Sequence, residues 1–385
     1  MKKLLTAASL LALTTLPSLA EPLKIGVITT LSGPAGYLGE QVRDGLQLAI
    51  DQEGGKLGGV DVELVVEDDG LKPGNGLQIA DKFMNEEGIK LITGIIFSNV
   101  AGATVPEVVE NDAIYISPNA GPSNLAGAGC NKNYFVVSWQ NDSLHEATGA
   151  AAKALGYKKV VALAPNYQAG KDAIAGFKRE FGGDVTEIYT QLEQTDFAPE
   201  MAQIRAAAPD AVFQFHPGGM GIAFLKQYVQ AGLSKDIPMI VSEPSADGVI
   251  LNAVGEAAVG LKATTHWNAD FDNEANKAMV AAWAAKHPDK PLTTYGQQAY
   301  DVGLLIASAL KKTGGIDDLD AFRAALKEAD FTSTRGDFKF GPNQHPVQDW
   351  FMVDIVAGPD GKPMWVTKEK LRDDVGDVYA AECKM

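Results

Sequence analysis

Cysteine is scarce in this sequence, which has only Cys130 and Cys383 among its 385 residues. Their spacing excludes a zinc site built from close cysteine pairs, and the five histidines show no metal-ligand clustering. The sequence also has no P-loop, no Gly-X-Ser-X-Gly motif and no nucleophile paired with a base. We therefore expect a protein that is not an enzyme and that holds no metal and no cofactor.

Positive charge is also in deficit, with 33 Lys and Arg residues against 49 Asp and Glu residues. The formal net charge of −16 argues against nucleic acid or an anionic membrane as a partner. The charge of the whole chain says nothing about a pocket, whose local field can have the opposite sign.

Long apolar runs are missing after the first residues, so the sequence predicts no membrane span there. The start itself has two lysines, an apolar segment and the small-residue end Ser18-Leu19-Ala20, which together predict a secretory signal peptide over residues 1–20. Cleavage would leave Glu21 first, with no cysteine beside it to carry a lipid anchor. Because exported proteins enter an oxidising compartment, one Cys130–Cys383 disulfide is expected, and two free thiols are the alternative.

The remaining chain is long enough for two domains and contains two runs in which strands and helices alternate. Buried strands separated by helical patterns are predicted at 23–29, 60–66, 91–93 and 113–117 in the first run, and at 159–164, 185–189, 211–215 and 238–241 in the second. Such alternation predicts a parallel sheet covered by helices for each run.

The later part of the chain breaks the alternation. Three successive helical patterns lie between residues 273 and 329, and we expect them to complete the first domain. A hairpin of strands 349–356 and 363–366 follows and should pack on the second domain.

These elements predict an α/β fold with two doubly wound parallel-sheet lobes joined by three hinge crossovers. The crossovers are expected near 138–142, 264–268 and 341–346. The predicted boundaries are 21–138 plus 267–342 for lobe 1, 139–266 plus 343–370 for lobe 2, and 371–385 for a tail that returns to lobe 1.

Small polar residues follow two neighbouring predicted strands of lobe 1. Ser98 comes after one strand, and Asn119, Ala120 and Gly121 come after the next. In an open α/β sheet, ligands bind beyond the carboxyl ends of strands, where helix N-termini expose unpaired N–H groups. These residues could offer a hydroxyl and backbone donors to one small anion, such as a carboxylate. The alternative is that they only form the turns between strands and helices.

Two helix starts are predicted from capping patterns. Ser98 and Asn99 have the side chains of a helix N-cap, and Ser143 with Glu146 has the spacing of a capping box. Both patterns predict side chains that satisfy backbone N–H groups of their own helix.

Four segments of the chain carry a family resemblance through their order and spacing. They are LSGPAGYLGEQVRDGLQLAID (31–51), ISPNAG (116–121), NYQAGKDAIAGFK (166–178) and PDAVF (209–213). The chain resembles the periplasmic solute-binding proteins of ABC importers, which have the type I periplasmic-binding fold, in their branched-chain amino-acid group. The resemblance implies a monomer in the periplasm that passes a small-molecule ligand to a membrane permease and has no nucleic-acid partner.

The resemblance also implies how the ligand's carboxylate is held. Ser98 would bind it after the third strand of the sheet. Asn119, Ala120 and Gly121 would add backbone and side-chain groups from the following turn. Tyr167 matches the ring-bearing residue that closes over the ligand from the second lobe.

The other residues of the implied site lie in different parts of the chain. Glu243 matches the acidic residue that pairs with a ligand ammonium. Leu38, beside Tyr37, matches the residue that contacts the ligand's side chain. His216 stands where the family has a tyrosine-rich turn, and it is a further candidate for ligand contact.

The ligand class stays open in the sequence. Gly121 replaces the threonine that usually ends its turn, and Asn119 replaces a small residue. The segment CNKNYFVVSWQND and the ending AAECKM resemble a subgroup that imports aromatic carboxylates. We expect a branched-chain or other hydrophobic amino acid, which the presence of Glu243 favours, with an aromatic carboxylate of the benzoate or hydroxycinnamate type as the alternative.

A function of a different class also fits the sequence. The same fold can serve as a soluble sensor that delivers its ligand to a membrane receptor. A third alternative, a hydrolase on an α/β scaffold, would require turnover of an ester or an amide.

Overall fold

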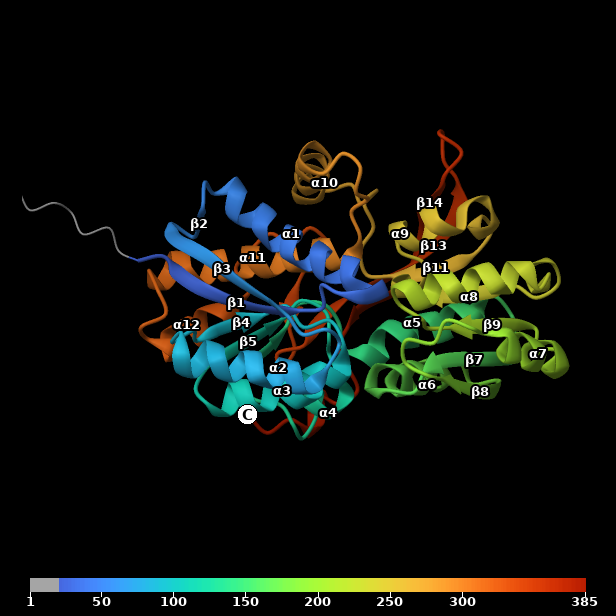
Figure 1. The fold of residues 1–385 in the computed structure, drawn as a ribbon, viewed down its shortest axis with the longest axis horizontal. Helices are drawn as coiled ribbons and strands as arrows, with labels where there is room; N and C mark the ends of the chain where they lie inside the picture. Colours follow the sequence, from blue (N-terminus) through green and yellow to red (C-terminus); the bar gives the residue numbers. More distant parts are fainter. Residues whose placement is uncertain (1–20) are drawn as a thin grey trace, which may run out of the picture.

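The computed structural model describes residues 21–385, so the predicted signal peptide lies outside the described part. Two sheets lie side by side, each flanked by helices, and we call the parts built on them lobe 1 and lobe 2 (Figure 1). The predicted α/β class with two lobes is confirmed. Within residues 21–385, no helix has both the length and the apolar composition that a bilayer crossing requires.

Lobe 1 is built on a sheet with the strand order β2-β3-β1-β4-β5-β6. Its strands are β1 (Leu23–Thr29), β2 (Lys56–Leu57), β3 (Val60–Asp68), β4 (Leu91–Thr93), β5 (Ile114–Ser117) and β6 (Tyr134–Val136). Its helices are α1 (Gly36–Gln52), α2 (Pro73–Asp81), α3 (Ser98–Glu110), α4 (Ser123–Ala126), α10 (Glu274–Lys286), α11 (Thr294–Thr313) and α12 (Leu319–Glu328). Except at β2, neighbouring strands run parallel, as the alternation of strands and helices predicts.

Helices α1 and α11 lie together on one side of this sheet, and α2 and α3 lie on the other (Figure 1). In the first pair, Gly45 of α1 lies directly against the backbone of Gly296 of α11. A Cβ added at Gly45 would lie 2.1 Å from the carbonyl oxygen of Gly296, so a larger residue at position 45 would force the two helix backbones apart. This contact places the N-terminus of α11 beside the sheet, although α11 follows lobe 2 in the sequence.

Lobe 2 is built on a mixed sheet with the order β12-β13-β11-β10-β9-β7-β8, and β14 pairs with β13. Its strands are β7 (Lys159–Pro165), β8 (Asp184–Thr190), β9 (Ala211–Gln214), β10 (Met239–Ser242), β11 (Lys262–Thr265), β12 (Lys339–Phe340), β13 (Pro346–Ala357) and β14 (Pro363–Val375). Its helices are α5 (Asn141–Ala154), α6 (Gln168–Phe181), α7 (Ala198–Ala207), α8 (Gly219–Gln230) and α9 (Gly248–Val254). The hairpin strand β14 runs beyond its predicted end because it pairs with β13 as far as Val375.

Alternate residues of β7 face opposite sides of the lobe 2 sheet. Val160 and Ala162 pack with Phe177 of α6, whereas Val161 and Leu163 pack with residues of α7, α8 and α9. Since side chains alternate across a strand, a strand buried on both sides reads as one continuous apolar run. This explains why the sequence of β7 contains no polar face.

The connections between the lobes meet at a buried arginine, Arg335. Its guanidinium forms an ion pair with Asp301 of α11 at 3.2 Å and donates to the carbonyl oxygen of Ser138 at 3.1 Å and to Oε1 of Gln348 at 2.7 Å. Ser138 precedes α5, and Gln348 lies near the start of β13. Arg335 therefore ties lobe 1 to two of the segments that lead into lobe 2.

Both predicted capping patterns are wrong. Ser98 is the first residue of α3 and does not cap it; its hydroxyl oxygen instead accepts from Nδ2 of Asn141 at 3.0 Å. Helix α5 begins at Asn141, earlier than predicted, and its N-cap is Gln140, whose side chain accepts from the backbone of Ser143. Ser98 thus bonds to a residue distant in sequence instead of capping its helix, and at α5 the neighbouring Gln140 takes the capping role.

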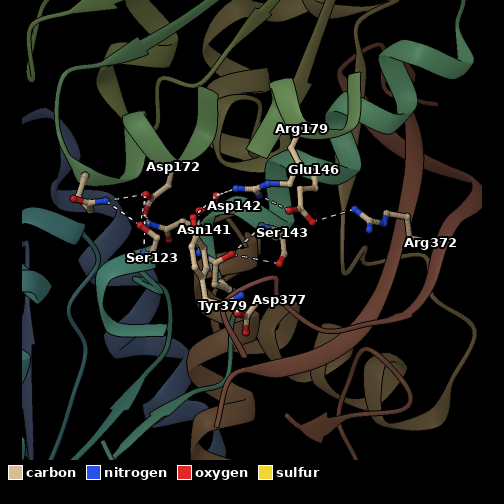
Figure 2. Close-up of polar contacts among 12 residues, drawn as sticks. Ser123, Asn141, Asp142, Ser143, Glu146, Asp172, Arg179, Arg372, Asp377 and Tyr379 are labelled. Carbon is tan, nitrogen blue, oxygen red and sulfur yellow. Dashed lines mark hydrogen bonds and ion pairs between the residues drawn. The ribbon is translucent and has the colours of Figure 1, made fainter. Parts of the chain in front are cut away.

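The chain ends on lobe 1, where Cys383 forms a disulfide with Cys130 (Figure 1). Their Cα atoms are 5.7 Å apart across a separation of 253 residues. Before it reaches Cys383, the tail is held against α5 by polar contacts (Figure 2). Arg372 donates to Glu146, and the Tyr379 hydroxyl donates to Asp142. The expected disulfide is thus formed, rather than two free thiols.

We predict that Cys383→Ser lowers the free energy of unfolding only modestly. Loop-closure entropy sets an upper limit on the order of 5 kcal/mol for so long a loop, but a loosened tail gives up little other structure. Urea denaturation should show a small loss, and ligand affinity should stay within a few-fold. A loss near the upper limit would contradict this account. Two reactive thiols in the denatured exported protein would contradict the pairing itself.

Candidate functional site

A small cavity lies between the lobes. Lobe 1 and lobe 2 both contribute to its walls, and most of the lining is apolar or aromatic. The lining residues are Ile96, Phe97, Ser98, Asn119, Trp139, Asn141, Leu144, His145, Tyr167, Ala169, Phe215, Pro217, Pro244 and Tyr295.

Four helices begin at this cavity. Ser98 is the first residue of α3, Asn141 is the first residue of α5, Tyr167 directly precedes α6, and Tyr295 is the second residue of α11. The first turn of a helix leaves N–H groups without intrahelical partners and carries a partial positive charge. The lining contains no lysine and no arginine, so these helix N-termini are its source of positive potential. The arrangement favours a small anion.

Asn141 organises the polar wall of the cavity. Its Nδ2 donates to the Ser98 hydroxyl oxygen at 3.0 Å and to Oδ2 of Asp172 at 2.9 Å, and its Oδ1 accepts from the backbone N–H of Gly121 at 3.2 Å. Since the Ser98 oxygen is an acceptor in this contact, its own hydrogen is left to donate to a ligand. Asn141 therefore orients the hydroxyl that the sequence assigns to the ligand.

The same network joins the two lobes. The backbone N–H and the hydroxyl of Ser123, in lobe 1, donate to Asp172 of α6 at 3.1 and 2.7 Å, so Ser123 and Asn141 both meet this carboxylate (Figure 2). Burial, with the nearby charge of Asp142, raises the pKa of Asp172 above its usual range. The contact can form only when the lobes are close together, so the structure describes a closed arrangement.

The aromatic walls of the cavity are uncharged at neutral pH. Phe97 of lobe 1 and Tyr167 of lobe 2 approach with ring centroids 6.3 Å apart. Burial raises the pKa of Tyr167 and of Tyr295 above the ordinary tyrosine value, so both keep their hydroxyl protons. Burial lowers the pKa of His145 to about 3, which leaves its imidazole neutral. No residue of the lining therefore carries a formal charge at neutral pH.

Of the residues predicted for the carboxylate, Ser98 and Asn119 line the cavity, and Ala120 and Gly121 lie behind them. The carbonyl oxygen of Ala120 accepts from Ser117, and the N–H of Gly121 is taken by Asn141. A Cβ at Gly121 would lie 2.0 Å from the carbonyl oxygen of Trp139, which explains why glycine replaces the family's threonine here.

Among the residues predicted from the second lobe, Tyr167 lines the cavity and His216 does not. His216 is buried in lobe 2, where its ring lies within hydrogen-bond distance of Thr190 and Gln214 and stacks on Phe224. Leu38 is fully buried in the core and also lies outside the lining.

Tyr37 and Glu243 take part in a second contact between the lobes. The Tyr37 hydroxyl donates to Oδ2 of Asp247 at 2.7 Å, which links α1 to the N-cap of α9. Glu243 is buried close to Asp247, and it lines a separate groove that also contains Trp267 and Trp365. Burial and the charge of Asp247 raise the pKa of Glu243 to about 8, and burial raises the pKa of Asp247 to about 6.

Several lining residues were not assigned to the ligand from the sequence. The clearest are Asn141, His145 and Tyr295. Asn141 and His145 are four residues apart on α5, a spacing that places both on one helix face, and this could have indicated a shared surface. Tyr295 gave no such signal, because its place depends on α11 packing back onto lobe 1 after the chain has formed lobe 2.

Comparison with known proteins gives a consistent picture. A family profile described as periplasmic binding protein matches residues 22–362. The chain is 30% identical over 374 residues to the Leu/Ile/Val-binding protein homolog 6 of Brucella melitensis, covering 94% of this chain and 95% of that protein.

Two solved structures of solute-binding proteins of ABC transporters are similar along nearly their whole length. One, from R. palustris in complex with benzoate, has a TM-score of 0.90 and 32% identity, covering 95% of this chain and 100% of the other. The other, from Rhodopseudomonas palustris BisB5 in complex with 3,4-dihydroxy benzoic acid, has a TM-score of 0.86 and 30% identity, covering 93% and 99%.

We predict that Glu243→Gln changes how stability depends on pH. A carboxyl with a pKa raised from 4.5 to about 8 keeps its proton in the folded state while the unfolded state loses it, so wild-type stability falls as pH rises through this window. The variant should have the same free energy of unfolding as the wild type near pH 4.5 and a larger one at pH 8. The upper limit of this difference is about 1.4 kcal/mol for each unit of pKa shift. Chemical denaturation at both pH values measures this.

The matched control is Glu256→Gln, since Glu256 is exposed. Its pH profile should follow the wild type. If Glu243→Gln also follows the wild type at every pH, Glu243 does not hold a proton in the folded protein.

Proposed function

The chain belongs to the periplasmic binding protein family, and from this premise we propose that its lobes close on an aromatic carboxylate, which it delivers to its permease. It is a solute-binding protein of an ABC transporter and not an enzyme. The family places it in the periplasm. The ligand, the bound geometry and the delivery step are our proposal.

The observation that carries the proposal is an aromatic lining without formal charge. Phe97, Trp139, Tyr167, Phe215 and Tyr295 supply flat apolar surfaces, which suit a benzene ring. An amino acid would in addition bring an ammonium group, and burying that charge without a carboxylate partner is costly. An aromatic acid brings only its carboxylate, which the helix N-termini and the Ser98 hydroxyl can hold.

A hydrophobic amino acid is the second candidate, since Glu243 directly precedes the lining residue Pro244. To serve an ammonium, Glu243 would have to lose its proton and turn toward the cavity. The relatives support both candidates, because one of them is named for Leu, Ile and Val and two others were solved with benzoate and 3,4-dihydroxy benzoic acid. The charge balance of the lining favours the aromatic acid.

We also propose how the lobes move. Residues 21–138 with 267–342 and residues 139–266 with 343–370 would rotate about the segments held by Arg335. The tail 371–385 would stay tied to lobe 1 through its disulfide and to α5 of lobe 2 through Arg372 and Tyr379. The bonds Tyr37–Asp247 and Ser123–Asp172 would open together with the cleft. We expect a monomer that delivers its ligand to a permease; transport assays in a permease deletion distinguish this from delivery to a membrane receptor.

We predict that benzoate and hydroxybenzoates bind and that leucine and isoleucine do not. Thermal-shift screening of the exported protein followed by calorimetry tests this, because ligand at a hundredfold excess over Kd adds about 2.7 kcal/mol of stability. Tight binding of leucine with no response to any aromatic acid would overturn the proposal in favour of the second candidate.

We predict that Ser98→Ala weakens aromatic-acid binding by about 1.5–3 kcal/mol, the range for a hydrogen bond to a charged group. Binding should persist because the helix N-termini remain. Calorimetry gives the change in Kd, and Ser234→Ala, at an exposed serine of lobe 2, is the control. An unchanged Kd would remove Ser98 from the site.

A further inference from the structure

Two polar atoms in the cavity wall have no hydrogen-bond partner among residues 21–385. They are Oδ1 of Asn119 and Nδ1 of His145, and both are fully buried. A buried polar atom without a partner costs about 1–3 kcal/mol, so native proteins rarely leave one unpaired. Both residues line the cavity, so a ligand bound there is in a position to supply the missing partners.

The amide of Asn119 is held so that its oxygen can only accept. Its Nδ2 donates to the carbonyl oxygen of Ile96 at 2.8 Å, and the backbone carbonyl oxygen of Asn119 accepts from the Ser138 hydroxyl at 2.7 Å. The bond from Nδ2 fixes the direction of the side-chain amide, and Oδ1 is left as an acceptor. A carboxylate also only accepts, so it cannot satisfy this atom. The ligand needs a hydrogen-bond donor in addition to its carboxylate.

His145 also has a ring nitrogen, Nδ1, without a hydrogen-bond partner among the described residues. Its ring packs edge-on against Phe215 and Phe213, with centroids 4.7 and 5.7 Å away. Its pKa of about 3 keeps the imidazole neutral, with one donor and one acceptor nitrogen. A hydroxyl can both donate and accept, so it can pair with Nδ1 in either tautomer.

We propose that the ligand is a hydroxylated aromatic carboxylate, whose ring hydroxyl bonds to Asn119 or His145 and makes these residues the determinants of selectivity. The inference rests on the proposed function. A ring hydroxyl fits better than an ammonium group, because the lining has no charge to compensate a cation. The hydroxyl of such a ring is neutral, and it donates without adding charge to the cavity.

Calorimetry on the unaltered protein tests the inference with three groups of ligands. These are benzoate, its 2-, 3- and 4-hydroxy derivatives, and the corresponding methoxy derivatives, which accept but cannot donate. At least one hydroxybenzoate should bind ten times more tightly than both benzoate and its own methoxy analogue, because only a ring hydroxyl can donate to Oδ1 of Asn119.

His145→Phe tests the role of the residue, since it keeps the aromatic packing and removes both ring nitrogens. The ratio of hydroxybenzoate affinity to benzoate affinity should shrink several-fold, whatever the change in benzoate affinity itself. The control is His287→Phe, which removes an imidazole outside the cavity and should leave the preference unchanged.

The outcomes separate the inference from the proposed function. If benzoate binds as tightly as every hydroxybenzoate, the inference is overturned and the proposed function stands. If no aromatic acid binds and leucine does, both are overturned. The ligand series does not depend on the variant, so it decides the question even if His145→Phe does not fold.

Discussion

Helix N-termini from both lobes converge on one cavity whose walls carry no formal charge, and the rest of the site depends on this convergence. Because α3 and α11 belong to lobe 1 and α5 and α6 belong to lobe 2, their partial positive charges act on one point only when the lobes are together. On the proposed function, binding an anion and closing the cleft would therefore be one event. A cation in the wall would attract anions to the open protein, whereas helix N-termini from two lobes act together on an anion only when the cleft is closed.

The position of α5 is set by a network of charges that reaches the end of the chain. Arg179 of α6 forms ion pairs with the buried carboxylates of Asp142 and Glu146, and Arg372 and Tyr379 approach the same pair from the tail (Figure 2). Removing one partner of a buried ion pair leaves an uncompensated charge, so such a network fixes the geometry strongly. It holds the N-terminus of α5, and with it Asn141, at the cavity.

The sequence predicted the two lobes and the part of the site that depends on single strand ends. Ser98, Asn119 and Tyr167 lie within a few residues after strand ends, so their place could be derived from the alternation and the family motifs. Tyr295 reaches the cavity only through packing between segments distant in sequence, which no local pattern records, and the spacing of Asn141 and His145 indicates a shared helix face but not what that face meets. The capping predictions were wrong for the same reason: Ser98 bonds to Asn141 and Glu146 pairs with two arginines.

The most direct test of the account is a crystal structure of the exported protein with a bound hydroxybenzoate. The account predicts a closed cleft that retains the Tyr37–Asp247 bond, with the ligand's carboxylate within hydrogen-bond distance of the Ser98 hydroxyl at the start of α3. It also predicts that the ring lies among the aromatic side chains of the cavity wall. A ligand bound in the groove beside Glu243, or held by one lobe with the cleft open, would contradict it.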